Sequence, residues 1–459
     1  MKKLLIGLLA ATLIFTLALP SFALGEAEKY DAMPELFAIT VEQQERKIDG
    51  NRAYVCKETL TTTSQKVNDE LRALVDHYDS ELSPSLWQDP RKNGKRNSRL
   101  DIEIVYYRTG ESWLSTLVIA RITRNLEPVS VAFTTRVFDL RTGERIMLDD
   151  IFASDSAAWP ILQNGVRQHF ASLFPDAKRD SAAIDALCTR EALAQADFTL
   201  SGMELTLHYQ AGTVVPDKTC LAHVRFFYPQ LSGMMTALGT RGTDNSRWKM
   251  VAITCDDGPN YNESFQALTA FRRVGARVTY FVVGKKLVNY SGNFIKEFDQ
   301  NHSMGSHSYH HWSGYSMKPA TRLKELELCA EMTEPLVGER AKLFRAPSGT
   351  YPPWIEAGMP VPIIQWSLDT YDYTGKDPQH IFYSVRNNVK EGDIILCHDT
   401  GLQLYKAVPI FADYLTKHGF MMVTVEELAM SQNVKLEPNA IYHRCYQGET
   451  RPRPDGNLN

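Results

Sequence analysis

Short apolar runs alternate with amphipathic stretches from residue 250 onward, a pattern typical of parallel strands joined by crossover helices. Apolar residues at helical spacing predict helices over 265–274, 323–336 and 403–417. Seven strands would suit a closed or nearly closed β/α barrel better than a small open sheet, so an α/β barrel is predicted over 250–430. The seven predicted strands cover 251–254, 278–283, 304–306, 343–345, 362–367, 394–397 and 421–425.

The chain before this barrel has the pattern of a smaller α+β domain. Helices are predicted over 63–78 and 159–174. Strands are predicted over 100–107, 113–122, 131–140 and 203–209. The pattern therefore predicts an α+β domain over 24–238, a polar linker over 239–249 and, after the barrel, a tail over 431–459.

The first residues have the pattern of an export signal over 1–23. Lys2 and Lys3 precede an apolar stretch over 4–19, and small residues flank a cleavage point after Ala23. An uncleaved membrane tether is the alternative, because this stretch is only a little shorter than the roughly 20 residues that span a bilayer. In both cases the rest of the chain is expected to be secreted or extracytoplasmic and associated with the cell envelope.

Composition excludes several classes of protein. The 459 residues are 44% apolar and 23% charged, which is typical of a globular chain with two or three domains. The net charge is −4 and no basic run would neutralise a phosphate backbone, so nucleic acid is not expected as a partner. Seven cysteines without a Cys-x-x-Cys pair exclude a zinc ribbon, although a Cys188–Cys220 disulfide is one option.

Polar side chains follow several strands of the predicted barrel. In a β/α barrel the carboxyl ends of all strands meet at one mouth, so these groups are expected to converge there. The residues are Asp256, Asp257, His307, Arg345, Asp369, Asp372 and His398.

A metal site is predicted at this mouth. One carboxylate and two neutral imidazoles form a ligand set for a divalent ion that leaves positions for water and substrate. Asp257, His307 and His311 fit this set, because the i, i+4 spacing lets both histidines point to one side of a turn or short helix. Zinc is the favoured ion, with cobalt or another late first-row ion as options. His310 competes as a ligand, and the His-x-x-x-His pair by itself would more simply be surface histidines.

A general base is predicted beside the metal. Asp256 can remove a proton from water, or it can cap the following loop. Arg345 can hold Asp256 ionised through a charge-assisted pair, or it can form a salt bridge with Asp369.

A general acid is predicted at the sixth strand. His398 can protonate the leaving amine, and Asp372 can orient its ring and raise its pKa. A lone histidine after a buried strand is more often structural, but here it stands in line with the other groups. A backbone N–H near Ser348 is expected to share the oxyanion with the metal. Together these groups describe amide hydrolysis.

The same residues stand in five ordered motifs that resemble the polysaccharide deacetylase family, the NodB-homology domain of carbohydrate esterase family 4. The motifs are Thr254-Cys255-Asp256-Asp257-Gly258, His307-Ser308-x-x-His311, Arg345-x-Pro347-x-Gly349, Asp369-x-x-Asp372 and Leu396-x-His398. The resemblance implies a deformed (β/α)7 barrel and a metal-dependent deacetylase. It implies the catalytic groups Asp256, His398, Arg345 and Asp372, the metal ligands Asp257, His307 and His311, and Leu396 as a wall of the acetyl methyl pocket.

Three departures from the family pattern change the walls of the site and leave its proton-transfer and metal groups intact. Cys255 stands where the family usually has phenylalanine, Ala346 and Ser348 fill positions commonly held by proline and tyrosine, and Tyr373 replaces the usual tryptophan. The particular sugar that the site accepts therefore stays open.

The region over 35–235 is similar to accessory domains that precede deacetylase domains in wall-modifying enzymes of Gram-positive bacteria and that recur in anti-sigma factors sensing lysozyme. Asp139-Leu140, Gly143 and the stretch 148–152 carry this similarity. It implies that the accessory domain binds glycan or protein, or acts as a spacer.

The substrate expected for the whole chain is a cell-wall polysaccharide with N-acetylated amino sugars, and peptidoglycan is the first candidate. Chitin-like oligomers, acetyl xylan and exopolysaccharide are alternative substrates. A catalytically silent wall-binding or sensing protein is the alternative from another class, although such family members usually lose a metal ligand or the base.

Overall fold

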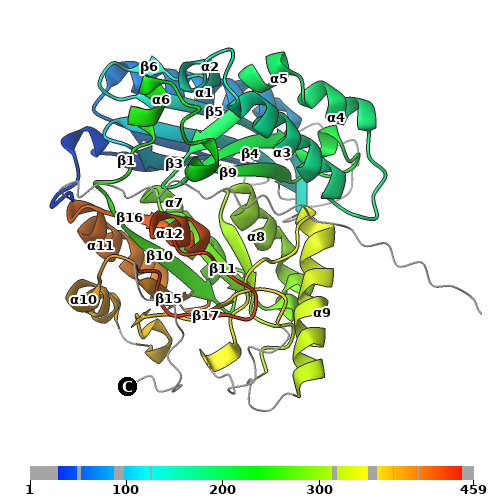
Figure 1. Cartoon of the computed structure of the whole chain (residues 1–459), viewed down its shortest axis with the longest axis vertical. Coiled ribbons are helices and arrows are strands. Elements are labelled where there is room, and N and C mark those ends of the chain that lie inside the picture. Colours follow the sequence, from blue (N-terminus) through cyan, green and yellow to red (C-terminus); the bar gives the residue numbers. More distant parts are fainter. Residues whose placement is uncertain are drawn as a thin grey trace, which may run out of the picture.

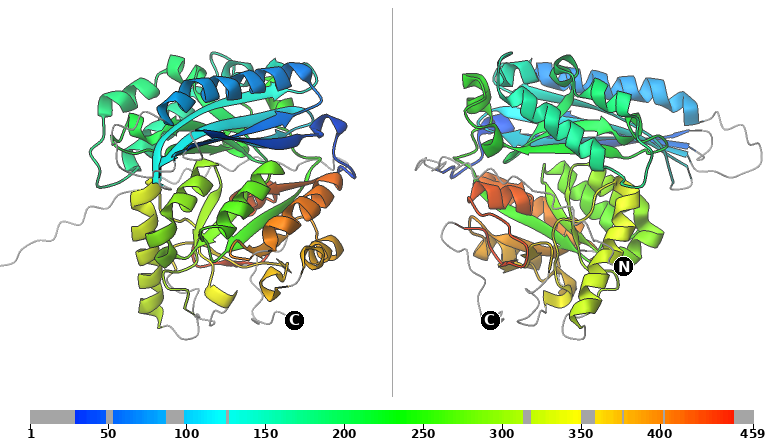
Figure 2. Two further views of the ribbon diagram at one scale, coloured as in Figure 1. Left: turned by 180° about the vertical axis from the view of Figure 1, so that it is seen from behind. Right: turned by 45° about the vertical axis from the view of Figure 1, so that its right-hand side comes forward.

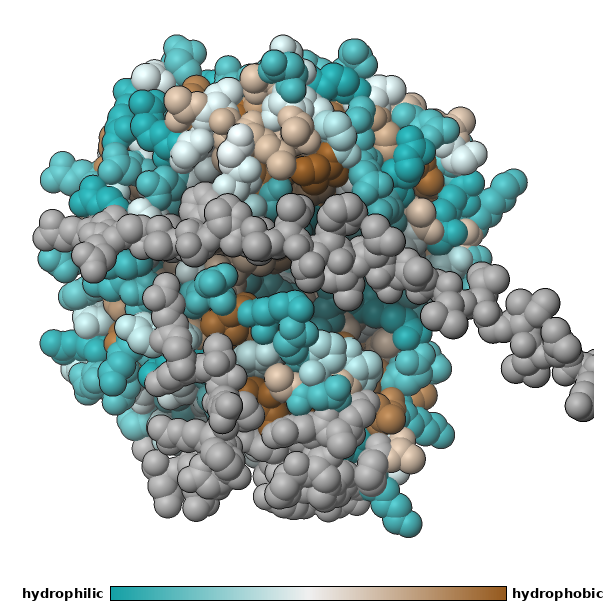
Figure 3. Space-filling view, viewed as in Figure 1, coloured by the Kyte–Doolittle hydropathy of each residue, from teal (hydrophilic) through white to brown (hydrophobic). Residues whose placement is uncertain are grey.

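The computed structural model describes residues 29–48, 53–86, 98–124, 127–312, 318–349, 359–375, 377–401 and 403–446. The export signal predicted over 1–23 and the last part of the tail, 447–459, lie outside the described residues. Among the described helices, none is both long and apolar enough to cross a membrane. On the face drawn in Figure 3, hydrophilic residues predominate and apolar ones occur in small groups.

The N-terminal region contains a six-stranded sheet in the order β1-β2-β3-β4-β5-β6. Helix α1 (Gln65–Leu82) connects β2 to its parallel neighbour β3, and the other neighbours are antiparallel. Val67, Leu71 and Val75 of α1 are buried, as their helical spacing predicts. The strands are β1 (Thr40–Ile48), β2 (Ala53–Thr61), β3 (Ser98–Thr109), β4 (Trp113–Arg124), β5 (Glu127–Asp139) and β6 (Glu144–Arg145).

Shorter elements complete this region. A three-stranded antiparallel sheet comprises β7 (Asp197–Leu200), β8 (Glu204–Gln210) and β9 (Leu221–Phe227). The helices are α2 (Leu148–Ile151), α3 (Ala158–Ser172), α4 (Ser181–Leu187), α5 (Arg190–Ala194) and α6 (Ala237–Gly242). The predicted strands and helices of this region are all present. Strands β1, β2, β6, β7 and β9 and the short helices α2, α4, α5 and α6 were not predicted.

The second region is built on parallel strands around β10 (Lys249–Asp256). Strands β11 (Val278–Val282) and β15 (Ile394–His398) both pair with β10, followed outward by β12 (Ser303–Ser306) and β14 (Leu368–Asp369). Strand β16 (Phe420–Val423) pairs with the first half of β10, and β13 (Ile363–Ile364) pairs with β17 (Ile441–Tyr442). The strand predicted over 343–345 is reduced to single bridges from Phe344 to Ser306 and Ile363.

Helices cover these strands, as the alternating pattern predicted. They are α7 (Glu263–Arg273), α8 (Leu287–Asp299), α9 (Pro319–Val337), α10 (Pro378–Asn388), α11 (Leu404–Lys417) and α12 (Val425–Ser431). Strands β10, β11 and β15 are almost entirely buried, which explains their near-continuous apolar sequence. A mixed α/β architecture with parallel strands is therefore confirmed.

The segment 239–249, whose composition predicted a linker, is folded against the N-terminal region. The side chain of Thr236 caps α6 by accepting a hydrogen bond from the backbone N–H of Gly239 over 3.0 Å. The indole N–H of Trp248 donates to the carbonyl oxygen of Gly110 over 2.9 Å, and Trp248 is buried. The first part of the predicted linker therefore belongs to helix α6, and Trp248 near its end packs against the N-terminal region.

The two regions form two layers (Figures 1 and 2). They share a hydrophobic cluster in which Leu100 and Val118 lie with Trp248 and Phe281. The N-terminal layer lies at the end of the second region where its strands begin. Buried ion pairs cross the interface, including Arg121 with Asp299 at 2.7 Å, Arg272 with Glu58 at 2.9 Å and Arg277 with Glu204 at 3.1 Å. The carboxyl ends of the parallel strands therefore face away from the N-terminal layer.

The Cys188–Cys220 disulfide considered from the sequence is not formed. All seven cysteines are free and buried. Cys188 ends α4 and Cys220 directly precedes β9, and both pack in the same hydrophobic cluster as small apolar side chains.

Candidate active site

The two adjacent aspartates at the end of β10 point in different directions. Asp256 is the last residue of β10 and is 3% exposed. Asp257 has a φ of 73°, a left-handed conformation that is uncommon outside glycine and often found at functional sites. Five of the ten described non-glycine residues with positive φ belong to the predicted motifs or their immediate surroundings: Asp257, Ser308, His311, Ser348 and Tyr371. The surrounding structure therefore holds this loop cluster in a defined shape.

Asp257, His307 and His311 come together as a candidate metal site. Oδ1 of Asp257 lies 2.9 Å from Nε2 of His311 and 3.5 Å from Nε2 of His307. The three ligand atoms lie within 4.8 Å of one another. Oδ1 of Asp257 is buried and makes no well-aligned hydrogen bond despite its short distance to His311. A buried carboxylate oxygen facing two imidazole nitrogens is the arrangement that a divalent ion requires.

The imidazoles of His307 and His311 have different surroundings, and their pKa values shift in opposite directions. Nδ1 of His307 lies 2.9 Å from the carbonyl oxygen of Arg345. That carbonyl can only accept, so Nδ1 carries the proton and Nε2 presents its lone pair toward Asp257. Burial lowers the pKa of His307, whereas contact with Asp257 raises the pKa of His311. Burial alone would raise the pKa of Asp257, but the nearby imidazoles lower it instead.

His310 does not take part in this site. Its Nδ1 lies 2.8 Å from Oε1 of Glu325, and its ring stacks on Trp312. The competition between His310 and His311 is therefore decided by Glu325, a buried residue of α9.

Arg345 and Asp256 form a buried ion pair. NH1 of Arg345 donates to Oδ1 of Asp256 over 2.7 Å and to Oγ1 of Thr254 over 2.7 Å. Its Nε and NH2 donate to the carbonyl oxygens of Ile364 and Gln365, each over 3.0 Å. The guanidinium is thus fixed on all sides and faces Asp256 rather than Asp369. Oδ2 of Asp256 lies 3.6 Å from Nε2 of His307, which places this carboxylate beside the candidate metal site.

His398, the last residue of β15, is paired with Asp372. Nδ1 of His398 lies 2.8 Å from Oδ1 of Asp372, and its backbone N–H donates to Oδ2 of the same carboxylate over 2.7 Å. Burial lowers the pKa of His398, but the hydrogen bond and charge of Asp372 outweigh this effect and raise the pKa to about 9. Since Cα atoms of His398 and Asp256 are direct partners in the β10–β15 register, the two pairs are neighbours.

The remaining predicted residues line the walls. Leu396 is 2% exposed and stands two residues before His398 on β15, so both side chains lie on one side of the strand. Ser348 is exposed in the short turn Pro347–Gly349 with a φ of 59°. Tyr373, which is 57% exposed, contacts the ring of His398 edge-on at 5.2 Å. The roles of Leu396 and Ser348 stay predictions.

Two contacts of the site were not expected from the sequence. Thr254, quoted in the first motif but given no role, is a partner of Arg345. Asp399, buried directly after His398, lies against Gly258, where an added Cβ would be only 2.3 Å from its Oδ2. The position of Asp399 after the last histidine was the only sequence signal for it.

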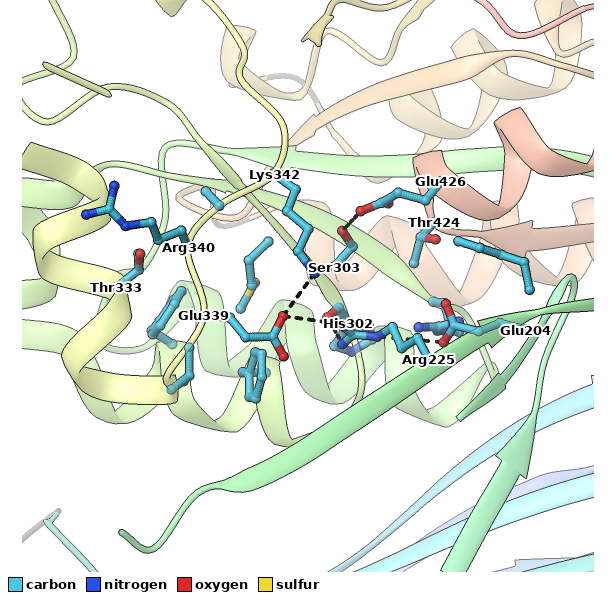
Figure 4. A pocket seen from close by; sticks show the side chains of 17 residues that line it. Glu204, Arg225, His302, Ser303, Thr333, Glu339, Arg340, Lys342, Thr424 and Glu426 are labelled. Carbon is cyan, nitrogen blue, oxygen red and sulfur yellow. Dashed lines mark hydrogen bonds and ion pairs between the residues drawn. The ribbon is translucent and has the colours of Figure 1, made fainter. Parts of the chain in front are cut away.

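A cavity of about 190 Å³ lies elsewhere, between the two regions at the amino ends of the strands (Figure 4). Glu204 and Arg225 of the N-terminal region line it together with Glu339 and Lys342. Its charges are already paired, with Arg225 3.7 Å from Glu204 and Lys342 3.4 Å from Glu339. The predicted site residues do not line this cavity. The candidate active site is at the opposite, carboxyl ends of the strands.

Comparison with known proteins gives the following similarities. Residues 243–357 match the sequence model of a family described as polysaccharide deacetylase. The peptidoglycan-N-acetylmuramic acid deacetylase PdaC of Bacillus subtilis is 27% identical over 180 residues, which are 39% of this chain and 38% of that protein. A peptidoglycan-N-acetylglucosamine deacetylase of Bacillus cereus is 30% identical over 189 residues, which cover 39% of this chain and 88% of that protein.

A solved structure of the peptidoglycan deacetylase PdaC from Bacillus subtilis is 26% identical. It covers 41% of this chain and 94% of its own chain, with a TM-score of 0.40. The chain spans about 38% of the length of the full Bacillus subtilis protein.

Proposed function

Because this chain belongs to the polysaccharide deacetylase family, we propose that it hydrolyses N-acetyl groups of amino sugars in cell-wall polysaccharide, with peptidoglycan as substrate. The observation that carries the proposal is the juxtaposition of two buried pairs, Arg345 with Asp256 and Asp372 with His398, beside three candidate metal ligands. The names of the relatives from Bacillus subtilis and Bacillus cereus support the choice of substrate.

A divalent ion, with zinc as the first choice, would be held by Asp257, His307 and His311. The buried Oδ1 of Asp257, which makes no well-aligned hydrogen bond, and the fixed tautomer of His307 both fit such an ion. Bound there, the ion would act as a Lewis acid toward the acetamide carbonyl and the attacking water.

In the proposed reaction, Asp256 accepts a proton from water as the water oxygen attacks the acetamide carbon. Arg345 donates a hydrogen bond to Asp256 and fixes its position. The tetrahedral intermediate then loses its C–N bond, and the amine nitrogen takes a proton from His398. Since Nδ1 of His398 faces Asp372, Nε2 is the atom that donates. The products are acetate and a free amino sugar, and Leu396 is proposed to contact the acetyl methyl group.

The finer architecture and location are part of the proposal. We assign the parallel strands of the second region to the deformed (β/α)7 barrel of the family, and the N-terminal region to an accessory domain that contacts glycan or protein. Export through residues 1–23, with cleavage or as a membrane tether, would place the enzyme at the cell wall.

The test is release of acetate by the chain lacking residues 1–23, loaded with zinc and incubated with peptidoglycan. Asp256→Asn, which keeps the shape of the side chain but removes the base, is expected to lower the rate about 100-fold or more. Chitin oligomers, acetyl xylan and an exopolysaccharide form the comparison panel. Release from acetyl xylan alone would reassign the substrate, and no release from any glycan would favour the silent wall-binding alternative.

A further inference from the structure

Two cysteines lie side by side on the strands that carry the proposed base and acid. Cys255 on β10 and Cys397 on β15 are direct partners in the parallel register. Each comes one residue before the end of its strand, where Asp256 and His398 stand. Neighbouring strands lie about 4.8 Å apart, and directly paired side chains point to the same face of the sheet. The backbone pairing of β10 with β15 therefore holds the two thiols next to each other.

The two thiols lie on the face of the strands that is turned away from the candidate active site. Asp256 points toward Arg345, so the side chain of Cys255 just before it points to the opposite face. There both cysteines belong to the hydrophobic cluster that the strands form with helices α7 and α11. They are 1% and 0% exposed, and a side-chain hydrogen bond joins the two thiols.

This placement suits a disulfide. Two cysteines can be bridged without moving the backbone when their Cα atoms lie about 4.4 to 6.8 Å apart and their side chains do not diverge. Direct partners on neighbouring parallel strands, with their sulfurs already in hydrogen-bond contact, meet this requirement. Among the other five cysteines only Cys56 lies in a strand, and its strand partners are Glu45 and Asp101.

We propose that Cys255 and Cys397, which are free in this structure, are a redox site that closes to a disulfide when the chain folds in an oxidising environment. Two S–H bonds break and one S–S bond forms. The two electrons and two protons pass to a small disulfide oxidant such as oxidised glutathione, which becomes two thiols. Because the folded pair is buried, the exchange takes place during folding, before α7 and α11 cover the strands.

The bond would link the strand of the proposed base to the strand of the proposed acid. It would close a loop that contains most of the second region, from the end of β10 to the end of β15. A crosslink across a long loop stabilises a protein by lowering the entropy of its unfolded chain. The oxidised chain is therefore expected to unfold at a higher temperature than the reduced chain, whether or not it deacetylates a glycan.

The experiment refolds the full chain from urea in a mixture of oxidised and reduced glutathione, and free thiols are then alkylated under denaturing conditions. Peptide mapping by mass spectrometry is expected to find Cys255 joined to Cys397. The melting temperature is expected to be about 5 °C higher for the oxidised than for the reduced chain. This difference should vanish in Cys255→Ala and in Cys397→Ala. Cys329→Ala, which removes another buried cysteine of the same cluster, is the matched control and should keep both the linkage and the difference.

Seven free thiols after folding in oxidised glutathione, or a linkage that joins other cysteines alone, would overturn the proposal. So would a Cys255–Cys397 linkage that leaves the melting temperature unchanged. If the chain aggregates on refolding, the same mapping is made on chain synthesised by cell-free translation in the same glutathione mixture, and the same outcomes decide. None of these measurements depends on acetate release, so a failure of the proposed function leaves this test intact.

Discussion

NH1 of Arg345 lies 2.7 Å from Oδ1 of Asp256 while the two side chains are 0% and 4% exposed. Taking two charges out of water is costly, and their mutual attraction offsets that cost only while both are present. The stability of the fold therefore depends on keeping the proposed base and its arginine together.

Arg345→Met is expected to lower the free energy of unfolding by about 3–5 kcal/mol, because Asp256 would be left as a buried unpaired charge. Acetate release is expected to fall about 100-fold or more. Urea unfolding and initial rates are the measurements. Arg340→Met is the control, since Arg340 forms its ion pairs with Glu327 and Glu334 at the surface and its loss should cost less than about 1 kcal/mol. Losses of equal size at both arginines would contradict the prediction.

Metal removal is expected to abolish acetate release, and added zinc or cobalt is expected to restore it. His307→Ala should lower the zinc content per chain, because it removes one of three ligands. His310→Ala should retain zinc, because His310 faces Glu325. Elemental analysis after dialysis distinguishes the two variants. Zinc loss from His310→Ala alone would show that the assignment of His307 as a ligand is wrong.

The pH dependence follows from the raised pKa of His398. A proton donor must be protonated, so kcat/KM is expected to fall as pH rises through about 9. The same pairing stabilises the fold fully below the ordinary histidine pKa of about 6.5, and that contribution is lost as pH rises through about 9. In Asp372→Asn the alkaline fall is expected to move toward pH 6.5. An unchanged pH profile in this variant would remove Asp372 from its assigned role.

A fragment that begins at residue 243 is expected not to fold by itself. It would expose Trp248 and leave Arg272 and Asp299 without the partners that the N-terminal region supplies. Circular dichroism and size-exclusion chromatography of this fragment and of the full chain are the measurements. A monomeric, cooperatively unfolding fragment would show that the interface is dispensable.

The sequence predicted the elements whose signals are local. Strands β10, β11 and β15 were found because both of their faces are buried, and α1 because its apolar residues recur at helical spacing. Strand β1 was missed because Thr40–Ile48 is mostly polar and becomes a strand by pairing with β2.

The catalytic and metal-binding side chains were predictable as a set because parallel strands bring their carboxyl ends together. The hydrogen-bond and ion-pair partners of each side chain were harder to predict. Glu325 selects His311 over His310 from a helix that follows later in the chain, and Arg121 meets Asp299 at a separation of 178 residues. No residue spacing reports such contacts, since they depend on how the two layers pack.

The contact between Gly258 and Asp399 has a consequence for related chains. The small residue of the first motif is required by the space that Asp399 occupies, since any side chain at position 258 would collide with that carboxylate. Positions 258 and 399 are therefore expected to covary during evolution. A related chain with a larger residue at position 258 is expected to have a smaller side chain at position 399.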